Sequence, residues 1–109
     1  MLVRVKAGEV IIRQGDPADR FYVVGEGEVE VTQTLPDAVE PRVLRRMGEG
    51  DGFGEIGLLS GSARTATVTA VAGGTLVALD GDAFLDLVKG AGITSPYAEI
   101  QRGAAATAG

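Results

Sequence analysis

The chain is 109 residues long, 45% of them hydrophobic and 23% charged, with a formal net charge of −5 and neither cysteine nor histidine. The composition excludes disulfides, thiolate or imidazole metal ligands and a serine–histidine–aspartate triad, so an enzyme is the least favoured class. The negative charge disfavours nonspecific binding to nucleic acid or anionic lipid, and no apolar run is long enough to span a membrane. One domain with a modest core is expected, and a binding or structural module is the first hypothesis.

Short apolar runs separated by glycines recur along the first eighty residues. The valines of residues 28–32 alternate with acidic residues, which is typical of an antiparallel strand with one buried face. Gly25-Glu26-Gly27, between two such runs, predicts a hairpin turn. The spacing predicts a mainly β fold, an antiparallel β-roll or jelly-roll of about eight short strands. The expected strands are 2–6, 10–13, 21–24, 28–33, 43–47, 65–71 and 75–79.

Helix signals are few and come late in the chain. Asp80 or Asp82 is a suitable N-cap for a helix over residues 82–88, with Gly90 as its terminator. The i, i+3, i+4 spacing predicts one apolar helix face, made by Phe84, Leu87 and Val88. We expect residues 1–90 to form the β-roll with this closing helix, and residues 91–109 to form a C-terminal tail that is partly flexible.

Residues 48–70 carry the candidate binding site, because glycines surround one acidic residue, Glu55, and a single arginine, Arg64, precedes a strand. Residues 55–59 suit one short helical turn, whose first N–H groups lack partners within the turn and favour an anion. A guanidinium pairs with a phosphate through two parallel hydrogen bonds. Glu55 repels phosphate, so it either accepts hydrogen bonds from hydroxyls or pairs with Arg64. A phosphate beside hydroxyls describes a nucleotide sugar-phosphate.

Two stretches of this segment carry a family resemblance. Phe53-Gly54-Glu55-Ile56-Gly57-Leu58-Leu59, followed by Arg64-Thr65-Ala66-Thr67-Val68, resembles the phosphate-binding cassette of cyclic-nucleotide-binding domains. The turn Gly15-Asp16-Pro17 resembles the opening of the same family, and the similarity extends over most of the chain. Ala63 departs from the family pattern, which commonly has proline before the arginine.

The resemblance implies a role for each cassette residue. Glu55 is expected to bond the ribose 2′-hydroxyl, and Arg64 is expected to pair with the cyclic phosphate. Thr65 is expected near phosphate and base, where its hydroxyl favours cGMP slightly over cAMP. The other implied contacts are backbone N–H groups around Gly54, Ile56 and Gly57, and packing of the base on Val43, Leu44 and Arg45.

Two further departures concern the ends of the domain. The family places a helical segment ahead of the roll and usually a longer C-terminal helix that caps the base, and neither is expected in this chain. Tyr97 is a candidate for a partial lid over the base, although a surface or docking role is favoured. We therefore expect a sensor module from a larger protein, or one that acts through partners.

Two charged groups outside the cassette have plainer interpretations. Arg45 and Arg46, beside Arg42, are favoured as a solvated strand face over a contact with base or partner. Glu26, Glu28 and Glu30 are interpreted as an exposed strand face, because no histidine or second carboxylate cluster joins them to form a metal site.

The expected function is a regulatory sensor that binds cAMP or cGMP as its ligand, with no cofactor, no metal and no enzymatic activity. A bacterial, cytoplasmic host is expected, with no nucleic-acid partner for this chain; the protein partner is an effector domain of the host or a second copy in a homodimer. The alternative is a degenerate roll that serves as a structural or interaction module without ligand, in which Glu55 and Arg64 form a structural ion pair.

Overall fold

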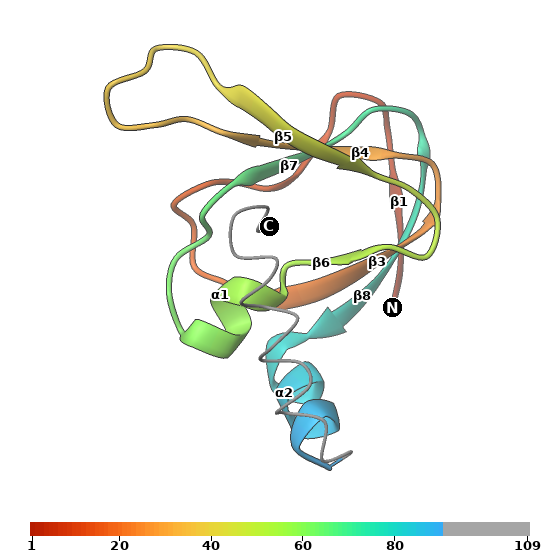
Figure 1. Ribbon diagram of the computed structural model, residues 1–109. Coiled ribbons are helices and arrows are strands. Elements are labelled where there is room, and N and C mark those ends of the chain that lie inside the picture. Colours follow the sequence, from red (N-terminus) through yellow and green to blue (C-terminus); the bar gives the residue numbers. More distant parts are fainter. Residues whose placement is uncertain (91–109) are drawn as a thin grey trace.

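Eight antiparallel strands and two short helices build the domain, as seen in a computed structural model that describes residues 1–90 (Figure 1). The predicted mainly β fold of about eight strands is confirmed. The strands are β1 (Leu2–Val5), β2 (Val10–Ile12), β3 (Arg20–Glu26), β4 (Val29–Gln33), β5 (Arg42–Met47), β6 (Gly52–Phe53), β7 (Thr67–Ala70) and β8 (Gly74–Asp80), and the helices are α1 (Glu55–Ser60) and α2 (Gly81–Gly90).

The strands form two four-stranded sheets that face each other (Figure 1). One sheet has the order β1-β8-β3-β6 and the other the order β2-β7-β4-β5. Period-two alternation turns one row of each sheet inward, so that valines, the aromatic ring of Phe53 and small residues fill the core between them. The most deeply buried large side chains are Phe53, Leu76, Val24, Val29, Val31 and Val68.

The predicted strand positions are confirmed within a few residues, but one predicted turn is wrong. Gly25-Glu26-Gly27 does not close a hairpin, because β3 belongs to one sheet and β4 to the other. Gly27 has a φ of 102°, a backbone conformation that favours glycine and lets the chain cross between the sheets. Strand β6 was not expected, since two residues are too few to show a period.

Both expected helices are present. In α2, Asp80 directly precedes the first helical residue, whereas Asp82 lies inside the first turn. Phe84 is buried and stacks on Phe21, with ring centroids 4.7 Å apart. Leu87 contradicts the predicted apolar face, because 62% of it is exposed.

The expected C-terminal tail, residues 91–109, and with it the candidate lid Tyr97, lie outside the described residues. Within residues 1–90, no helix is long and apolar enough to cross a membrane. The helices α1 and α2 lie at one end of the two sheets (Figure 1), so the cassette helix α1 is next to the helix that follows the roll.

Candidate functional site

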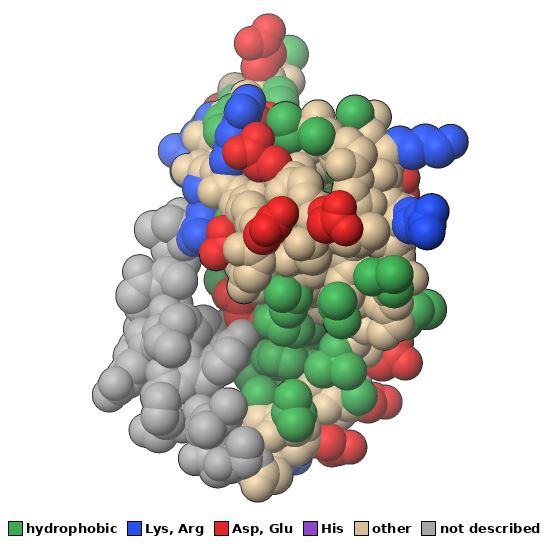
Figure 2. Space-filling view, turned by 90° about the vertical axis from the view of Figure 1, so that its right-hand side faces the viewer, with side chains coloured by type: hydrophobic (Ala, Val, Ile, Leu, Met, Phe, Trp, Pro, Cys, Tyr) green, Lys and Arg blue, Asp and Glu red, His purple; other side chains and the backbone are tan. Residues whose placement is uncertain are grey.

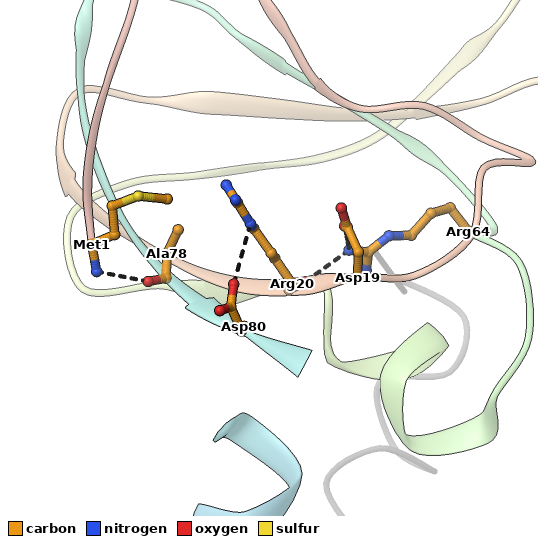
Figure 3. A network of polar contacts seen from close by, with 6 residues as sticks. All are labelled: Met1, Asp19, Arg20, Arg64, Ala78 and Asp80. Atoms are coloured by element: carbon orange, nitrogen blue, oxygen red, sulfur yellow. Dashed lines mark hydrogen bonds and ion pairs between the residues drawn. The ribbon is translucent and has the colours of Figure 1, made fainter. Parts of the chain in front are cut away.

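Arg64 is the most deeply buried charged residue of the described chain, with 3% of its surface exposed. Its guanidinium donates from Nη1 to the carbonyl oxygen of Gly54 at 2.6 Å and from Nη2 to that of Arg20 at 2.7 Å. Nη2 also lies 3.4 Å from Oδ1 of Asp19. Figure 3 shows the side chain extending toward the start of β3, where Asp19 and Arg20 lie. Arg64 is therefore held by oxygen acceptors from two different segments.

The Gly-Asp-Pro turn fixes the backbone of Arg64. The amide of Gly15 donates to the carbonyl of Arg64, and the amide of Arg64 donates to the carbonyl of Asp16, both at 2.8 Å. Pro17 and Ala63 form an isolated antiparallel bridge beside them. The turn at residues 15–17 and the start of the second cassette stretch at Arg64 are therefore hydrogen-bonded to each other.

Two glycines give α1 its place against Arg64. Gly54, at the N-cap of α1, has a φ of 96°, and a Cβ there would lie 2.9 Å from the Arg20 carbonyl oxygen and 3.1 Å from Nη1 of Arg64. A Cβ on Gly57 would lie 2.6 Å from that of Ala18. Any side chain at either position would push α1 away from the residues at the start of β3 and from Arg64.

Glu55, the first residue of α1, differs from Arg64 because part of its charged group is buried without a partner in the described chain. Its Oε2 is buried and has no hydrogen-bond partner among the described residues. Burial raises the pKa of this carboxyl, and its own backbone N–H, Arg45 and Arg64 only partly oppose the shift. The predicted alternative, a structural ion pair of Glu55 with Arg64, is wrong, since among residues 1–90 the carboxylate within 4.0 Å of Arg64 is that of Asp19.

The three arginines expected on a solvated strand face differ in position. Arg46 lies outside the roll, 3.1 Å from Glu30 and 3.7 Å from Glu28, so the acidic strand face is partly neutralised. Arg42 donates to the side chain of Gln33 at 3.0 Å. Arg45 is opposite the buried Val31 in the register, on the inner side of β5, and acts electrostatically on Glu55. Arg45 therefore belongs to the neighbourhood of the cassette.

The other residues predicted to contact the nucleotide differ in how far they are buried. Ile56 is half-buried, and Thr65 is exposed directly after Arg64. Of the residues expected to pack on a base, Leu44 is partly buried against the core. Val43 is 59% exposed and does not reach the core, because a register shift between Val31 and Thr32 turns the Val43 side chain outward.

Sequence reasoning missed the partners of Arg64. Two of them are backbone carbonyls, which have no residue signature, and the third is Asp19 in the turn region. The signal available for Asp19 was its place two residues after Pro17, in the part of the chain that already carried the resemblance.

Comparisons with known proteins show what the chain is similar to. The family described as the cyclic nucleotide-binding domain matches residues 2–90. A cAMP-dependent protein kinase regulatory subunit from Dictyostelium discoideum is 48% identical over 84 residues, which are 75% of this chain and 26% of that protein. The cGMP-dependent protein kinase egl-4 from Caenorhabditis elegans is 43% identical over 82 residues, which are 74% of this chain and 10% of that protein.

A solved structure matches as well. The regulatory domain of Toxoplasma gondii PKA, co-crystallised with cAMP, has a TM-score of 0.77 and 36% identity, covering 84% of this chain and 34% of that one. The chain thus spans about a quarter of the regulatory subunit and a tenth of the cGMP-dependent kinase. Most of each relative lies outside the matched region.

Proposed function

This chain belongs to the cyclic nucleotide-binding domain family, a family of regulatory domains, and we propose that it still binds a cyclic purine nucleotide at the cassette. The observation that carries the proposal is that the buried, oriented guanidinium of Arg64 acts electrostatically on Glu55, whose buried Oε2 has no hydrogen-bond partner in residues 1–90. A cyclic nucleotide supplies an anionic phosphate for the first and a 2′-hydroxyl donor for the second.

The phosphate is proposed to meet Arg64 and the first N–H groups of the cassette turn, around Gly54, Ile56 and Gly57. A guanidinium has five N–H donors, and the present contacts occupy Nη1 and Nη2 of Arg64, which leaves donors for a phosphate oxygen. Since Glu55 Oε2 is already buried, a hydroxyl that donates to it removes an existing penalty. Removal of this desolvation penalty favours a ribose hydroxyl beside Glu55.

The base edge is proposed to face Thr65 and Arg45. Guanine presents two acceptors, O6 and N7, whereas adenine presents an N6 donor beside N7. Both protein groups can donate to guanine, so we expect cGMP to bind more tightly than cAMP. Leu44 supplies the apolar surface on which either base can pack.

Asp19 supports a regulatory role for the domain. Its carboxylate lies 3.4 Å from Arg64, and its carbonyl accepts the amide of Gly81, the first residue of α2, at 2.8 Å. A phosphate that draws Arg64 toward itself therefore acts on the residue that holds the start of α2. An effector in the host protein is proposed to respond to that helix.

A second candidate is a roll that has kept the fold and lost the ligand. It is favoured by the oxygen contacts of Arg64, which hold the guanidinium in place without a nucleotide. Three predictions are common to both candidates: residues 1–90 form one unit, the host is bacterial and cytoplasmic, and the chain has no enzymatic activity.

Thermal unfolding separates the two candidates. We propose melting the chain alone and with cGMP, cAMP or guanosine, which lacks the phosphate. A ligand at 100 times its Kd stabilises a one-site protein by about 2.7 kcal/mol, and each kcal/mol raises the Tm of a domain this size by roughly 4 to 8 °C. The proposal predicts such a rise with a cyclic nucleotide and a much smaller one with guanosine. No rise with either cyclic nucleotide would favour the ligand-free roll.

A further inference from the structure

The backbone at Arg64 and Thr65 is held by three hydrogen bonds from outside the cassette. The Arg64 amide donates to the carbonyl of Asp16, and the Arg64 carbonyl accepts from the amide of Gly15, both at 2.8 Å. The next carbonyl, that of Thr65, accepts a hydrogen bond from Nε2 of Gln33 at 3.0 Å. The Gly-Asp-Pro turn therefore fixes the arginine, and the end of β4 fixes the threonine.

Gln33 makes its bond at the point where strand pairing stops. The last pair of the β4–β7 ladder is Thr32 with Thr67, so Thr65 lies beyond the paired residues. A side chain from β4 continues the hold on the chain where the ladder of backbone bonds ends. Gln33 is half-buried, and Thr65 is exposed. The contact can therefore be removed by mutation without breaking the backbone bonds of the sheet.

Arg42 sets the direction of the Gln33 amide. A glutamine amide accepts at its oxygen and donates at its nitrogen, and it can turn so that the two exchange places. Nη2 of Arg42 donates to Oε1 of Gln33 at 3.0 Å, and the two residues are opposite each other in the β4–β5 register. Because a guanidinium has no acceptor, Oε1 faces Arg42, and Nε2 is then directed at the Thr65 carbonyl.

Arg46, on the same strand, has a different role. It lies 3.1 Å from Glu30 and 3.7 Å from Glu28. Figure 2 shows acidic and basic side chains next to each other on the upper part of the molecule, the part that carries β4 and β5 in Figure 1. Arg46 thus balances charge on the surface. Arg42 donates to a neutral amide, so its contact with Gln33 orients a hydrogen-bonding group.

Gln14 holds the strand end that carries Gln33. Its Oε1 accepts the amide of Thr34 at 2.8 Å, and its Nε2 donates to the carbonyl of Thr34 at 2.9 Å. Gln14 also directly precedes Gly15, whose amide bonds the Arg64 carbonyl. The two glutamines therefore connect the turn, the end of β4 and the cassette in one circuit of hydrogen bonds.

We propose that Gln33, oriented by Arg42, is a positioning residue for nucleotide selectivity. It holds the backbone of Thr65, whose hydroxyl we expect to donate to guanine, so the inference rests on the proposed function. Without the bond from Gln33, the exposed Thr65 can turn about its backbone and move its hydroxyl away from the base edge. The phosphate contacts depend on Arg64, which the Gly-Asp-Pro turn holds independently. Loss of Gln33 should therefore lower affinity for cGMP and affect cAMP little.

Competition titrations of cGMP and cAMP against the full chain test the proposal. Gln33→Leu removes the amide, and the preference for cGMP over cAMP should fall about twofold to fivefold. Glu30→Leu is the matched control, because Glu30 is on the same strand and bonds Arg46, and it should keep the wild-type preference. A wild-type preference in Gln33→Leu, or an equal loss of affinity for both nucleotides, would overturn the inference and leave the proposed function in place.

A double-mutant cycle shows whether Gln33 acts through Thr65. In Thr65→Ala the hydroxyl is gone, so adding Gln33→Leu should leave the remaining preference between the two nucleotides unchanged. A general loss of structure would act in both backgrounds. The same fall in preference with and without the Thr65 hydroxyl would therefore overturn the proposed positioning.

The role of Arg42 has its own pair of variants. Arg42→Met removes the donor that orients the amide, so the preference for cGMP should fall by a smaller factor than in Gln33→Leu. Arg42→Lys can still donate to Oε1 of Gln33 and should restore most of the preference. Arg46→Met is the matched control on the same strand and should behave as the wild type. Equal preferences in Arg42→Met and Arg42→Lys would overturn the assignment of Arg42.

A measurement without nucleotide separates a failure of this inference from a failure of the proposed function. In the ligand-free chain, the NMR chemical shift of the Thr65 carbonyl carbon should change in Gln33→Leu, which removes its donor, and stay constant in Glu30→Leu. No change in Gln33→Leu would overturn the inference alone. A wild-type chain that has this bond but binds neither nucleotide would overturn the proposed function, and the role of Gln33 in selectivity with it.

Discussion

The two charged residues of the cassette, Arg64 and Glu55, lie in opposite electrostatic environments. Arg64 is buried with several oxygen partners, so its environment stabilises the charged form whether or not a ligand is present. Glu55 is buried with an oxygen that has no partner in residues 1–90, and its pKa is raised. The arginine is thus part of the fold, and the glutamate is a cost to the fold that a ligand can relieve. Changes at either residue should weaken nucleotide binding, more strongly at Arg64 than at Glu55, and should shift the stability of the ligand-free domain in opposite directions.

The largest effect is expected from Arg64→Glu. It removes the phosphate's partner and places a carboxylate against three oxygen acceptors, so affinity for a cyclic nucleotide should fall by about 2 to 5 kcal/mol, roughly 30-fold to several-thousand-fold. The Tm without ligand should fall as well. Lys89→Glu, the same charge change on exposed α2, is the control for both measurements. Wild-type affinity in Arg64→Glu would refute the assignment of the phosphate site.

Gly54→Ala tests whether the loop before α1 must approach the arginine this closely. A non-glycine residue at a φ of 96°, with its Cβ 2.9 Å from a carbonyl oxygen, should lower the free energy of unfolding by about 1 to 3 kcal/mol. Gly48→Ala is the matched control, since nothing lies within 4 Å of a Cβ there and its φ is not in the left-handed region. Chemical denaturation measures both, and equal losses would contradict the proposed tight approach.

Glu55→Gln should separate binding from stability. It replaces a charged acceptor by a neutral one, so binding should weaken by about 1 kcal/mol, roughly fivefold. Without ligand the variant should be as stable as the wild type or more stable at neutral pH, because the buried charge is gone. Calorimetric melts and ligand titration of the same samples provide both numbers, and a marked loss of stability would show that Glu55 has a structural partner.

The raised pKa of Glu55 also predicts a pH dependence. The folded state binds this proton more tightly than the unfolded state, so the contribution of Glu55 to stability falls as pH rises from the unfolded pKa through the raised folded pKa. Subtracting the pH profile of Glu55→Gln from that of the wild type isolates this slope. A hydroxyl that donates to the ionised carboxylate should make nucleotide affinity rise over the same interval.

The smallest expected effect is at Thr65, which is exposed. Thr65→Ala should weaken cGMP binding by about 0.5 to 1.5 kcal/mol, roughly twofold to twelvefold, and leave cAMP binding nearly unchanged. Competition titrations with the two nucleotides measure the ratio. An equal loss for both would assign the hydroxyl to the phosphate rather than to the base.

Local patterns predicted most of the fold. The valines of β4 alternate because one face is buried, and that period is visible in the sequence. The wrong hairpin at Gly25-Glu26-Gly27 shows the limit of such patterns, because a glycine turn looks the same whether it closes a hairpin or carries the chain to another sheet. Leu87 has the right helical spacing, but the described residues leave most of its side chain exposed.

The site was predictable to the extent that its residue types carry its chemistry. Glu55 and Arg64 were found because a carboxylate and a guanidinium among glycines suggest a sugar-phosphate. Their relation was not predictable, since the partners of Arg64 are chiefly carbonyl oxygens whose positions depend on the paired turn at Gly15 and Asp16. The resemblance implied that Arg45 lies near the base, but its electrostatic effect on Glu55 depends on strand register, which a single sequence does not display.

Isothermal titration of cGMP into the wild-type chain and into Arg64→Glu and Lys89→Glu measures whether Arg64 binds the cyclic phosphate. We expect one nucleotide per chain for the wild type and for Lys89→Glu, with binding abolished or greatly weakened in Arg64→Glu. Absence of heat with both cGMP and cAMP in a folded wild-type chain would contradict it and would leave the roll as an interaction module.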